Sequence, residues 1–429
     1  MENLGSYIKY FRKKNKITQR ELAKGIISVS YLSRIENNIE QPSREISNLL
    51  KDRLGIQENE LQTSQNVVQQ LKKCYKEIAE KKLDSASKRL KSYEKLMVNQ
   101  KSLVSDYYYK VVRAFYCLYN QEFTEAAHLL AGIGEIELVS LDKEGLYYYS
   151  RIKALHDFYQ QKYESAYKLL NEARSLRSRL TDNEAWETAE LNYILGLTTS
   201  KLRLDPLSIH YTREALAFYQ TTYHFKRSAQ CHLLLGITYE RTNLITIAKE
   251  QLSKAIKIAK NIDDTLLISK ACHNLAHHFV TKGESLRAIE EFQICYDYKL
   301  KANVPDHLLL STIFCMVTEY YRLEEYIECR KWAEQGLEII RMNEYDHSYY
   351  YHFQILLKYI KVEPDFETFA SDHAIPHFRS ISKMEYVVRY THLLGSYYQS
   401  LHKYKQAAAC YEESLALFNS KFYTKGLLL

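Results

Sequence analysis

The stretch LGITYERTNLITIAKEQLSKA, residues 235–255, decides the fold of this chain. A small residue, Gly236, is followed twelve positions later by another, Ala248, and apolar residues at helical spacing flank both. Two variants occur, LAHHFVTKGESLRAIEEFQIC at 275–295 and LGSYYQSLHKYKQAAACYEES at 394–414. Small residues let two helices approach and larger ones pack between units, so the pattern predicts a repeated helix-turn-helix unit.

The repeat has a period close to 40 residues over most of the chain. The tripeptide YYY occurs at 107–109, 147–149 and 349–351. Small residues keep the same period at Ala86, Ala126, Ala166, Ala248, Ala288, Cys329 and Ala407. The pattern resembles the tetratricopeptide repeat, whose usual period is about 34, so the helices should be longer than the consensus. Eight or nine such units would fill residues 65–429 and, by the resemblance, form a right-handed α-solenoid with a concave surface.

Composition agrees with an all-α chain. Only 12 Gly and 5 Pro occur among 429 residues, which favours long helices and short turns. Most of the 38 Tyr are expected to fill the layers between repeat units. No run reaches the roughly 18 apolar residues of a membrane helix, and the N-terminus lacks a signal-peptide pattern. We therefore expect a cytoplasmic protein without a membrane partner.

Neither the cysteines nor the histidines predict a metal site. The 8 Cys form no C-x-x-C pair, and we interpret them as reduced and mostly buried. His273 with His277, and His373 with His377, have the i, i+4 spacing of metal ligands, but neither pair has the glutamate of H-E-x-x-H or an evident third ligand. Phosphate-loop and nucleophile-elbow motifs do not occur. We expect no enzyme activity, no metal and no cofactor.

Residues 1–56 differ from the rest of the chain in charge. They carry 11 Lys and Arg against 6 Asp and Glu, whereas the remainder has 48 against 46. Thr18 and Glu21 form a predicted capping box for one short helix, and Ser28 is the expected cap of the next. The apolar face of that next helix is expected at Val29, Leu32 and Ile35. Two short helices joined by a tight turn, the second with a polar outward face, have the geometry that enters a DNA major groove.

The run LGSYIKYFRKKNKITQRELAKGIISVSYLSRIENNIEQPSREISNLLKDRLGI, residues 4–56, resembles the Cro/repressor type of helix-turn-helix. The resemblance implies a salt bridge between Arg12 and Glu36. It also implies a fourth helix that closes the core with Ile46, Leu49, Leu50 and Leu54. Arg can bind guanine edges, while Ser, Asn and Tyr contact bases or phosphates. The expected DNA-binding residues are Gln19, Ser28, Ser30, Tyr31, Ser33, Arg34 and Asn37.

A Cro-type module followed at once by tetratricopeptide-like repeats resembles the RRNPP family of peptide-quorum-sensing regulators. Within that family the chain looks most like the NprR-like members and next most like the PlcR-like members. The resemblance implies a helix-turn-helix DNA-binding domain at residues 1–64 and a repeat domain at residues 65–429 for peptide binding and oligomerisation. The implied partners are a double-stranded DNA operator, a short signalling peptide and further copies of the chain in a dimer or higher oligomer.

Polar residues on the first helix of each repeat are the candidates for holding a peptide. An Asn amide can donate to a peptide carbonyl and accept from its N–H, while Lys or Arg selects a carboxylate. By the phasing of the repeat, the expected peptide-binding residues are Arg151, Asn192, Tyr193, Lys201, Gln230, Glu240, Lys270, His273, Asn274 and His277.

A second function stays open. The chain is also similar to the Rap proteins, adaptors whose repeats bind and inhibit a response-regulator or phosphorelay partner. Rap-like adaptors carry a helical bundle in place of the basic module. The intact module at residues 1–64 therefore favours the peptide-controlled transcription regulator.

Overall fold

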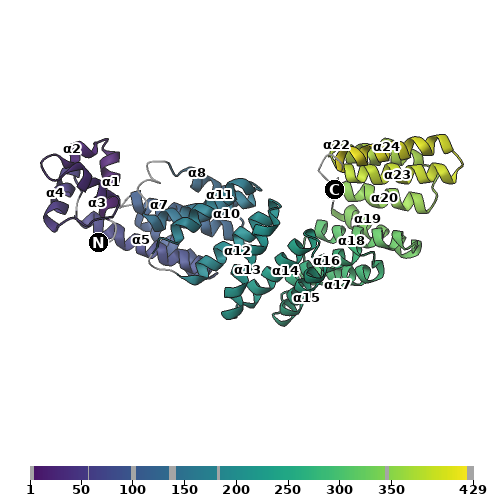
Figure 1. The fold of residues 1–429 in the computed structure, drawn as a ribbon, viewed down its shortest axis with the longest axis horizontal. Helices are drawn as coiled ribbons and strands as arrows, with labels where there is room; N and C mark the ends of the chain where they lie inside the picture. Colours follow the sequence, from purple (N-terminus) through teal and green to yellow (C-terminus); the bar gives the residue numbers. More distant parts are fainter. Residues whose placement is uncertain are drawn as a thin grey trace. The chain divides into compact units, whose positions relative to one another are not determined.

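The structure is a computed structural model that describes residues 4–56, 58–97, 103–134, 142–180, 184–343 and 347–422. Every regular element in these ranges is a helix (Figure 1). The chain divides into two compact units, residues 1–222 and 223–429. The all-α fold class predicted from composition and periodicity is confirmed.

Four helices form the N-terminal module. They are α1 Leu4–Lys14, α2 Gln19–Ala23, α3 Val29–Glu36 and α4 Arg44–Leu54. The core of the module consists of side chains with no exposed surface, contributed by all four helices: Ile8, Leu22, Leu32, Ile35 and Leu50. The module therefore has a hydrophobic core of its own beside the repeats.

Two apolar residues of the module lie outside its core, contrary to the sequence prediction. Leu49 is 47% exposed and Val29 is 42% exposed. The buried face of α4 contains Leu50 and Leu54, and at 3.6 residues per turn Leu49 lies roughly 150° around the helix from the middle of that face. Val29 opens the first turn of α3, where fewer side chains surround it.

The rest of the described chain consists of successive helix pairs (Figure 1). In the first unit the pairs are α5 Glu58–Ala79 with α6 Leu83–Met97, α7 Leu103–Tyr119 with α8 Phe123–Ala131, α10 Lys143–Tyr159 with α11 Tyr163–Arg177, and α12 Ala185–Lys201 with α13 Asp205–Thr221. The predicted domain boundary at residue 64 falls within α5, and the division at that residue stays a prediction.

The second unit continues the same series. Its pairs are α14 Phe225–Arg241 with α15 Ile245–Asn261, α16 Thr265–Thr281 with α17 Ser285–Lys301, α18 Asp306–Arg322 with α19 Tyr326–Asn343, and α23 Met384–Ser400 with α24 Tyr404–Phe422. Four further segments lie in the chain between α19 and α23. They are α20 His347–Ile360, α21 Phe366–Thr368, the π-helical segment η1 Phe369–Ala374 and α22 Ile375–Ser380. The solenoid of helix pairs predicted from the repeat is thus present in both units.

The turns inside the pairs share one backbone feature. Each holds a residue with positive φ, at Lys81, Gln121, Gln161, Arg203, Asn243, Gly283, Glu324 and His402, and Val362 has the same conformation in the turn after α20. A single left-handed residue ends the first helix and reverses the chain within about three residues. All but one of these residues carry a side chain, so the turns recur with the repeat although glycine is rare.

The small residues of the repeat lie where the paired helices approach. Ala248 and Ala288 have no exposed surface. A Cβ placed on Gly236 of α14 would lie 2.7 Å from Cδ2 and Cγ of Leu252 on α15. The small residues therefore set how closely the two helices pack, as the sequence pattern predicts.

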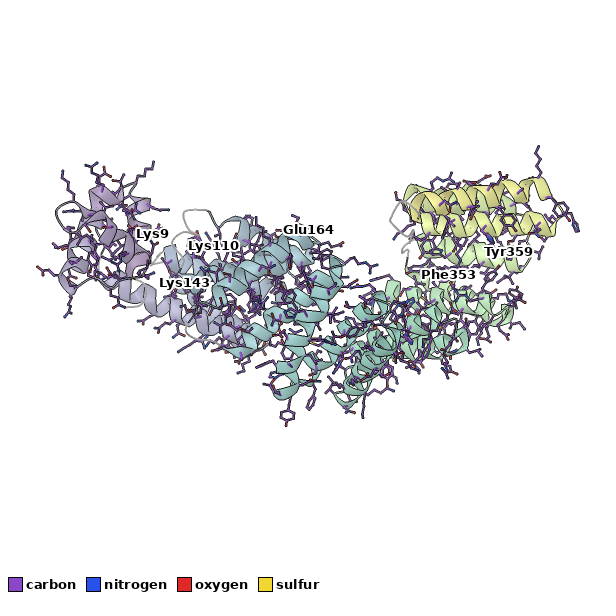
Figure 2. All side chains as sticks on the ribbon, in the orientation of Figure 1. Lys9, Lys110, Lys143, Glu164, Phe353 and Tyr359 are labelled. Atoms are coloured by element: carbon purple, nitrogen blue, oxygen red, sulfur yellow. The ribbon has the colours of Figure 1, made fainter. Side chains whose placement is uncertain are left out.

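Tyrosine and cysteine follow the packing interpretation, and Figure 2 draws the described side chains on the ribbon. The largest fully buried side chains include Tyr75, Tyr107, Tyr108, Tyr147 and Tyr390. All eight cysteines are free thiols, six of them buried, with Cys315 and Cys410 partly exposed. The predicted reduced state of the cysteines agrees with this arrangement.

We predict that Gly236→Ala lowers the stability of the second unit by about 1–3 kcal/mol, because the new methyl group overpacks against Leu252. Gly132→Ala is the control, since its Cβ would meet nothing closer than 3.5 Å. That control should leave stability unchanged or raise it by up to about 1 kcal/mol. Urea unfolding followed by circular dichroism measures both, and equal midpoints for the two variants would contradict the packing argument.

Candidate functional sites

The second and third helices of the module begin at capped residues. Thr18 Oγ1 accepts from the backbone N–H of Glu21 at 3.2 Å, and the Glu21 carboxylate accepts from the backbone N–H of Thr18 at 2.7 Å. Ser28 Oγ accepts from the N–H of Tyr31 at 3.2 Å. Both predicted caps are confirmed, so the sequence itself fixes where α2 and α3 begin.

A buried polar network ties three helices of the module together. Arg12 Nε donates to Glu36 Oε1 at 2.6 Å, and Arg12 Nη2 donates to Glu36 Oε2 at 2.8 Å. Their side chains are only 10% and 0% exposed. Gln19 Nε2 also donates to Glu36 Oε2, at 2.8 Å. The predicted salt bridge is confirmed, and Gln19 joins α2 to it.

The predicted DNA-binding residues lie on α3 and its two ends, apart from Gln19 at the start of α2. Ser30 and Arg34 are exposed, and Arg34 Nη2 lies 2.6 Å from Glu40 Oε1. The Asn37 side chain accepts from Lys9 Nζ at 3.0 Å. Tyr31 and Ser33 are partly exposed. The surface thus offers several hydroxyls, one amide and one guanidinium from a single short helix, and its DNA contact stays a prediction.

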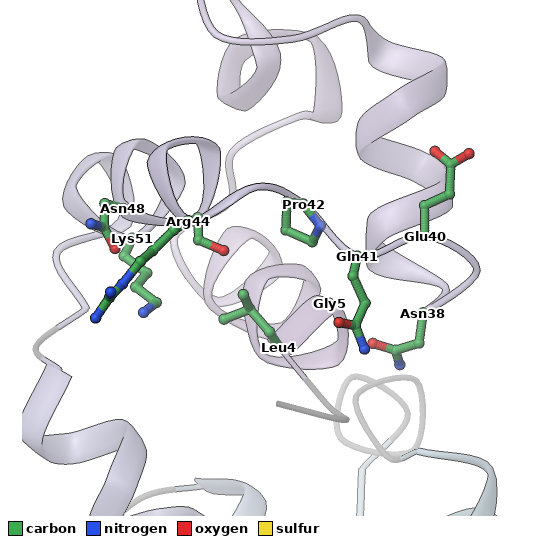
Figure 3. Close-up of a pocket in the computed structure, with 10 residues that line it drawn as sticks. Leu4, Gly5, Asn38, Glu40, Gln41, Pro42, Arg44, Asn48 and Lys51 are labelled. Atoms are coloured by element: carbon green, nitrogen blue, oxygen red, sulfur yellow. The ribbon is translucent and has the colours of Figure 1, made fainter.

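A pocket of about 310 Å³ lies in the N-terminal module (Figure 3). Its walls come from the start of α1, the loop after α3 and the helix α4. None of the predicted DNA-binding residues lines it, although Glu40, the partner of Arg34, does. The pocket is therefore separate from the outward face of α3.

Five of the ten predicted peptide-binding residues occupy two recurring positions on the first helices of the pairs. Arg151, Tyr193 and His273 are each the ninth residue of their helix. Gln230 and Lys270 are each the sixth residue. Sixth and ninth positions lie on one helical face, so each helix places these side chains on the same side.

The first unit contains four of these residues. Arg151 is 1% exposed, its guanidinium donates to the Tyr75 hydroxyl, and its Cζ lies 5.4 Å from the ring centre of Phe115. Asn192 is 4% exposed and its Oδ1 has no hydrogen-bond partner. Tyr193 is buried and Lys201 is exposed. Arg151 and Asn192 are thus interior polar groups rather than open surface.

One acidic residue that the sequence did not single out, Glu187, lies beside this interior. Glu187 is 4% exposed and its Oε2 lies 3.1 Å from Arg177 Nε. Burial raises the pKa of Glu187, and the charges of Arg151 and Arg177 oppose that rise. Beyond helical periodicity, the sequence gives no signal that Glu187 lies near Arg151 and Arg177, because Glu187 belongs to a different repeat from the two arginines.

The second unit contains the other six residues. Glu240 accepts from His278 Nδ1 and from Thr281 Oγ1, both at 2.8 Å. Gln230 accepts from Arg227 Nη1 at 2.8 Å. Asn274 Nδ2 donates to the carbonyl of exposed Lys270 at 2.7 Å.

His273 and His277 face each other on α16, with their Nε2 atoms 3.2 Å apart. Burial lowers the pKa of both rings, that of His273 to about 3, and the charge of Lys299 lowers both further. Cys315 Sγ of α18 lies 3.9 Å from His277 Nε2. The sequence analysis missed this cysteine, since 38 residues separate it from His277.

Known proteins resemble this chain over nearly all of its length. The helix-turn-helix family HTH_3 matches residues 8–61. The transcriptional activator NprA of Geobacillus stearothermophilus is 34% identical over 401 residues, which are 92% of this chain and 98% of that protein.

Two solved structures share the fold. The apo form of the quorum sensor NprR from B. thuringiensis has a TM-score of 0.68 at 17% identity, over 83% of this chain and 100% of that one. The apo form of RapI has a TM-score of 0.67 at 18% identity, over 85% of this chain and 99% of that one. None of the described helices combines the length and apolarity needed to span a membrane.

We predict that Glu36→Gln destabilises the N-terminal module by about 3–5 kcal/mol, because it leaves the buried Arg12 charge without its counter-ion. Glu40→Gln breaks the exposed pair with Arg34 and should cost no more than about 1 kcal/mol. Thermal unfolding of the full chain, followed by amide exchange within α1–α4, measures both. Equal protection of the module in the two variants would show that the buried pair does not hold it together.

Proposed function

Because this chain belongs to the RRNPP family of peptide-quorum-sensing regulators, we propose that it is a transcription regulator whose α3 reads a DNA operator and whose repeats hold a short signalling peptide. Residues 1–64 would bind the operator. Residues 65–429 would bind the peptide and a further copy of the chain. No cofactor or catalytic group is assigned to this function.

The exposed face of α3 supports the DNA-binding part of the proposal. Arg34 is the one guanidinium on that helix, and its side chain is 58% exposed. Arginine in a major groove donates to O6 and N7 of one guanine, whereas the nearby serine hydroxyls suit phosphates or base edges. The ion pair with Glu40 is exposed, so a guanine can replace the carboxylate at little cost.

We predict that Arg34→Ala weakens binding to the preferred operator by about 1–3 kcal/mol and relaxes sequence preference at one base pair. An operator selected from random duplex DNA and a gel-shift series at fixed salt provide the measurement. Glu40→Gln is the matched control, since it removes the ion pair but keeps the guanidinium. If both variants lose affinity equally, Arg34 acts through Glu40 and does not contact DNA.

Unpaired polar atoms inside the first unit support the peptide-binding part. The atoms without a hydrogen-bond partner there include Asn192 Oδ1, Arg151 Nε and Tyr147 Oη. Tyr147 and Arg151 are one helical turn apart on α10, and α10 contacts α12, which carries Asn192. Each unpaired buried group costs about 1–3 kcal/mol, so a ligand that pairs with them is favoured.

An extended peptide offers the complementary groups. Its backbone N–H groups suit the free carbonyl oxygen of Asn192, and its carbonyls or terminal carboxylate suit Arg151 and Tyr147. The identity of the peptide's side chains need not matter, because these contacts use backbone atoms. In the second unit, Lys270 and Asn274 present the same kinds of group on α16.

We predict that Asn192→Ala lowers peptide affinity by about 1–3 kcal/mol without destabilising the free protein, since the substitution removes an unpaired oxygen. The probe is a synthetic peptide of roughly five to ten residues taken from a secreted pro-peptide encoded beside the gene, measured by calorimetry. Asn171→Ala is the control, because Asn171 lies on the second helix α11 and donates to the Tyr167 carbonyl. Unchanged peptide affinity in Asn192→Ala would remove that residue from the site.

Peptide and operator binding would be coupled through the repeats. Each repeat contacts its neighbours, so a small change of pitch at the peptide adds up along the series. Two half-sites about 34–36 Å apart demand a fixed separation of the two α3 helices of a dimer. A peptide that binds one dimer geometry better would therefore shift operator affinity, by about 1–3 kcal/mol in an ordinary case.

The fold likeness to RapI keeps a second candidate function in view, that of an adaptor whose repeats bind a response-regulator or phosphorelay protein. The helix-turn-helix match over residues 8–61 favours the transcription regulator, because DNA binding needs that module and an adaptor does not. The gel-shift series separates the two, since an adaptor would show no preferred operator.

A further inference from the structure

Three side chains in the second unit bring metal-binding atoms together from two different helix pairs. His273 and His277 come from α16, and Cys315 comes from α18. One ligand atom from each lies within 4.8 Å of the others. Since the two helices belong to separate pairs, the cluster is a product of the tertiary fold, and the histidine spacing alone does not reveal it.

The distances are close to those of a bound metal. Zinc bonds of about 2.0–2.1 Å to nitrogen and about 2.3 Å to sulfur, at a tetrahedral angle, place two nitrogens about 3.3 Å apart and a nitrogen and a sulfur about 3.6 Å apart. The Nε2 atoms of His273 and His277 are 3.2 Å apart. Cys315 Sγ lies 3.9 Å from His277 Nε2. These two distances differ from the zinc values by a few tenths of an ångström, and the ligand atoms of His273 and Cys315 lie within 4.8 Å of each other.

The surroundings hold the two imidazoles in position. Both rings pack edge-on against Phe292 of α17, with ring centres 5.5 Å and 5.3 Å away. His273 Nδ1 is buried and has no hydrogen-bond partner. His273 can therefore carry its proton on Nδ1 and offer the lone pair of Nε2 to a metal.

The charges near the cluster come from two further helices, α17 and α23, and from α18 itself. Lys299 of α17 donates to the Thr312 hydroxyl at 2.7 Å, which holds its ammonium group in a contact of its own. Burial raises the pKa of Cys315 to about 12, and the charges of Lys299 and Arg389 oppose that rise while Glu319 adds to it. A metal would displace the thiol proton, and the thiolate would offset the positive neighbours.

We propose that His273, His277 and Cys315 form a three-ligand site for Zn²⁺, with the fourth position open to water or to an atom of a bound molecule. Two imidazoles and a thiolate select zinc over Mg²⁺ and Ca²⁺, which require oxygen ligands. Three protein ligands with one open position is the arrangement of an exchangeable or reactive zinc site rather than of a closed structural one. The site shares His273 and His277 with the predicted peptide-binding residues, so zinc binding is measured without peptide or DNA.

Zinc titration of the chelator-treated full chain, in competition with a chromophoric chelator, tests the proposal. We expect one Zn²⁺ per chain, and at least about tenfold weaker binding in His277→Gln and in Cys315→Ser. Circular dichroism checks that His277→Gln folds. With Co²⁺ as a second probe, the thiolate-to-cobalt charge-transfer band should be present in the unsubstituted chain and missing in Cys315→Ser.

Two matched controls use the same chemistry elsewhere in the unit. His373→Gln alters the other i, i+4 histidine pair, and Cys410→Ser removes the other partly exposed thiol. Both should bind zinc as the unsubstituted chain does. The proposal fails if the unsubstituted chain takes up no Zn²⁺ at micromolar concentration, if folded His277→Gln binds as tightly as before, or if the controls lose zinc to the same extent.

Discussion

The close approach of the two helices within each pair is the contact on which the rest of the structure depends. At Gly236 the backbone of α14 comes so near to Leu252 of α15 that a single methyl group would collide with it. A helix pair of this kind cannot bury its apolar faces alone, so it needs neighbours on both sides. Because small residues recur along the sequence, closely packed helix pairs recur as well and stack on one another. Equivalent positions of successive first helices then lie along one face of the stack.

The N-terminal module is organised by a different constraint, the buried ion pair of Arg12 and Glu36. A buried pair contributes little net stability compared with apolar side chains, but it tolerates few alternative arrangements. Here Glu36 is the last residue of α3 and also accepts from Gln19 at the start of α2. The network thus fixes the mutual orientation of α2 and α3, and this orientation decides which side chains of α3 point outward.

Local features were predictable from sequence, whereas contacts between repeats were not. The helix caps at Thr18 and Ser28 depend on spacings of a few residues. The positions of the small residues depend on a single repeat period. The exposure of Leu49 shows that a helical stripe read from sequence can be wrong by one position, since its neighbour Leu50 is buried. The burial of Arg151 and the approach of Cys315 depend on how neighbouring pairs pack, and no sequence spacing specifies that.

The two roles considered for α16 place different demands on its histidines. Each neutral imidazole has one lone pair, so a ring that binds zinc through Nε2 must carry its proton on Nδ1. His273 Nδ1 is buried without a partner, and as a donor it would need an acceptor such as a ligand carbonyl. Without zinc, one Nε2 donates to the other and neither nitrogen is available to a peptide. Zinc binding would therefore break the hydrogen bond between the two Nε2 atoms and make His273 Nδ1 a donor. Asn274 and Lys270 would remain the peptide-facing groups with and without zinc.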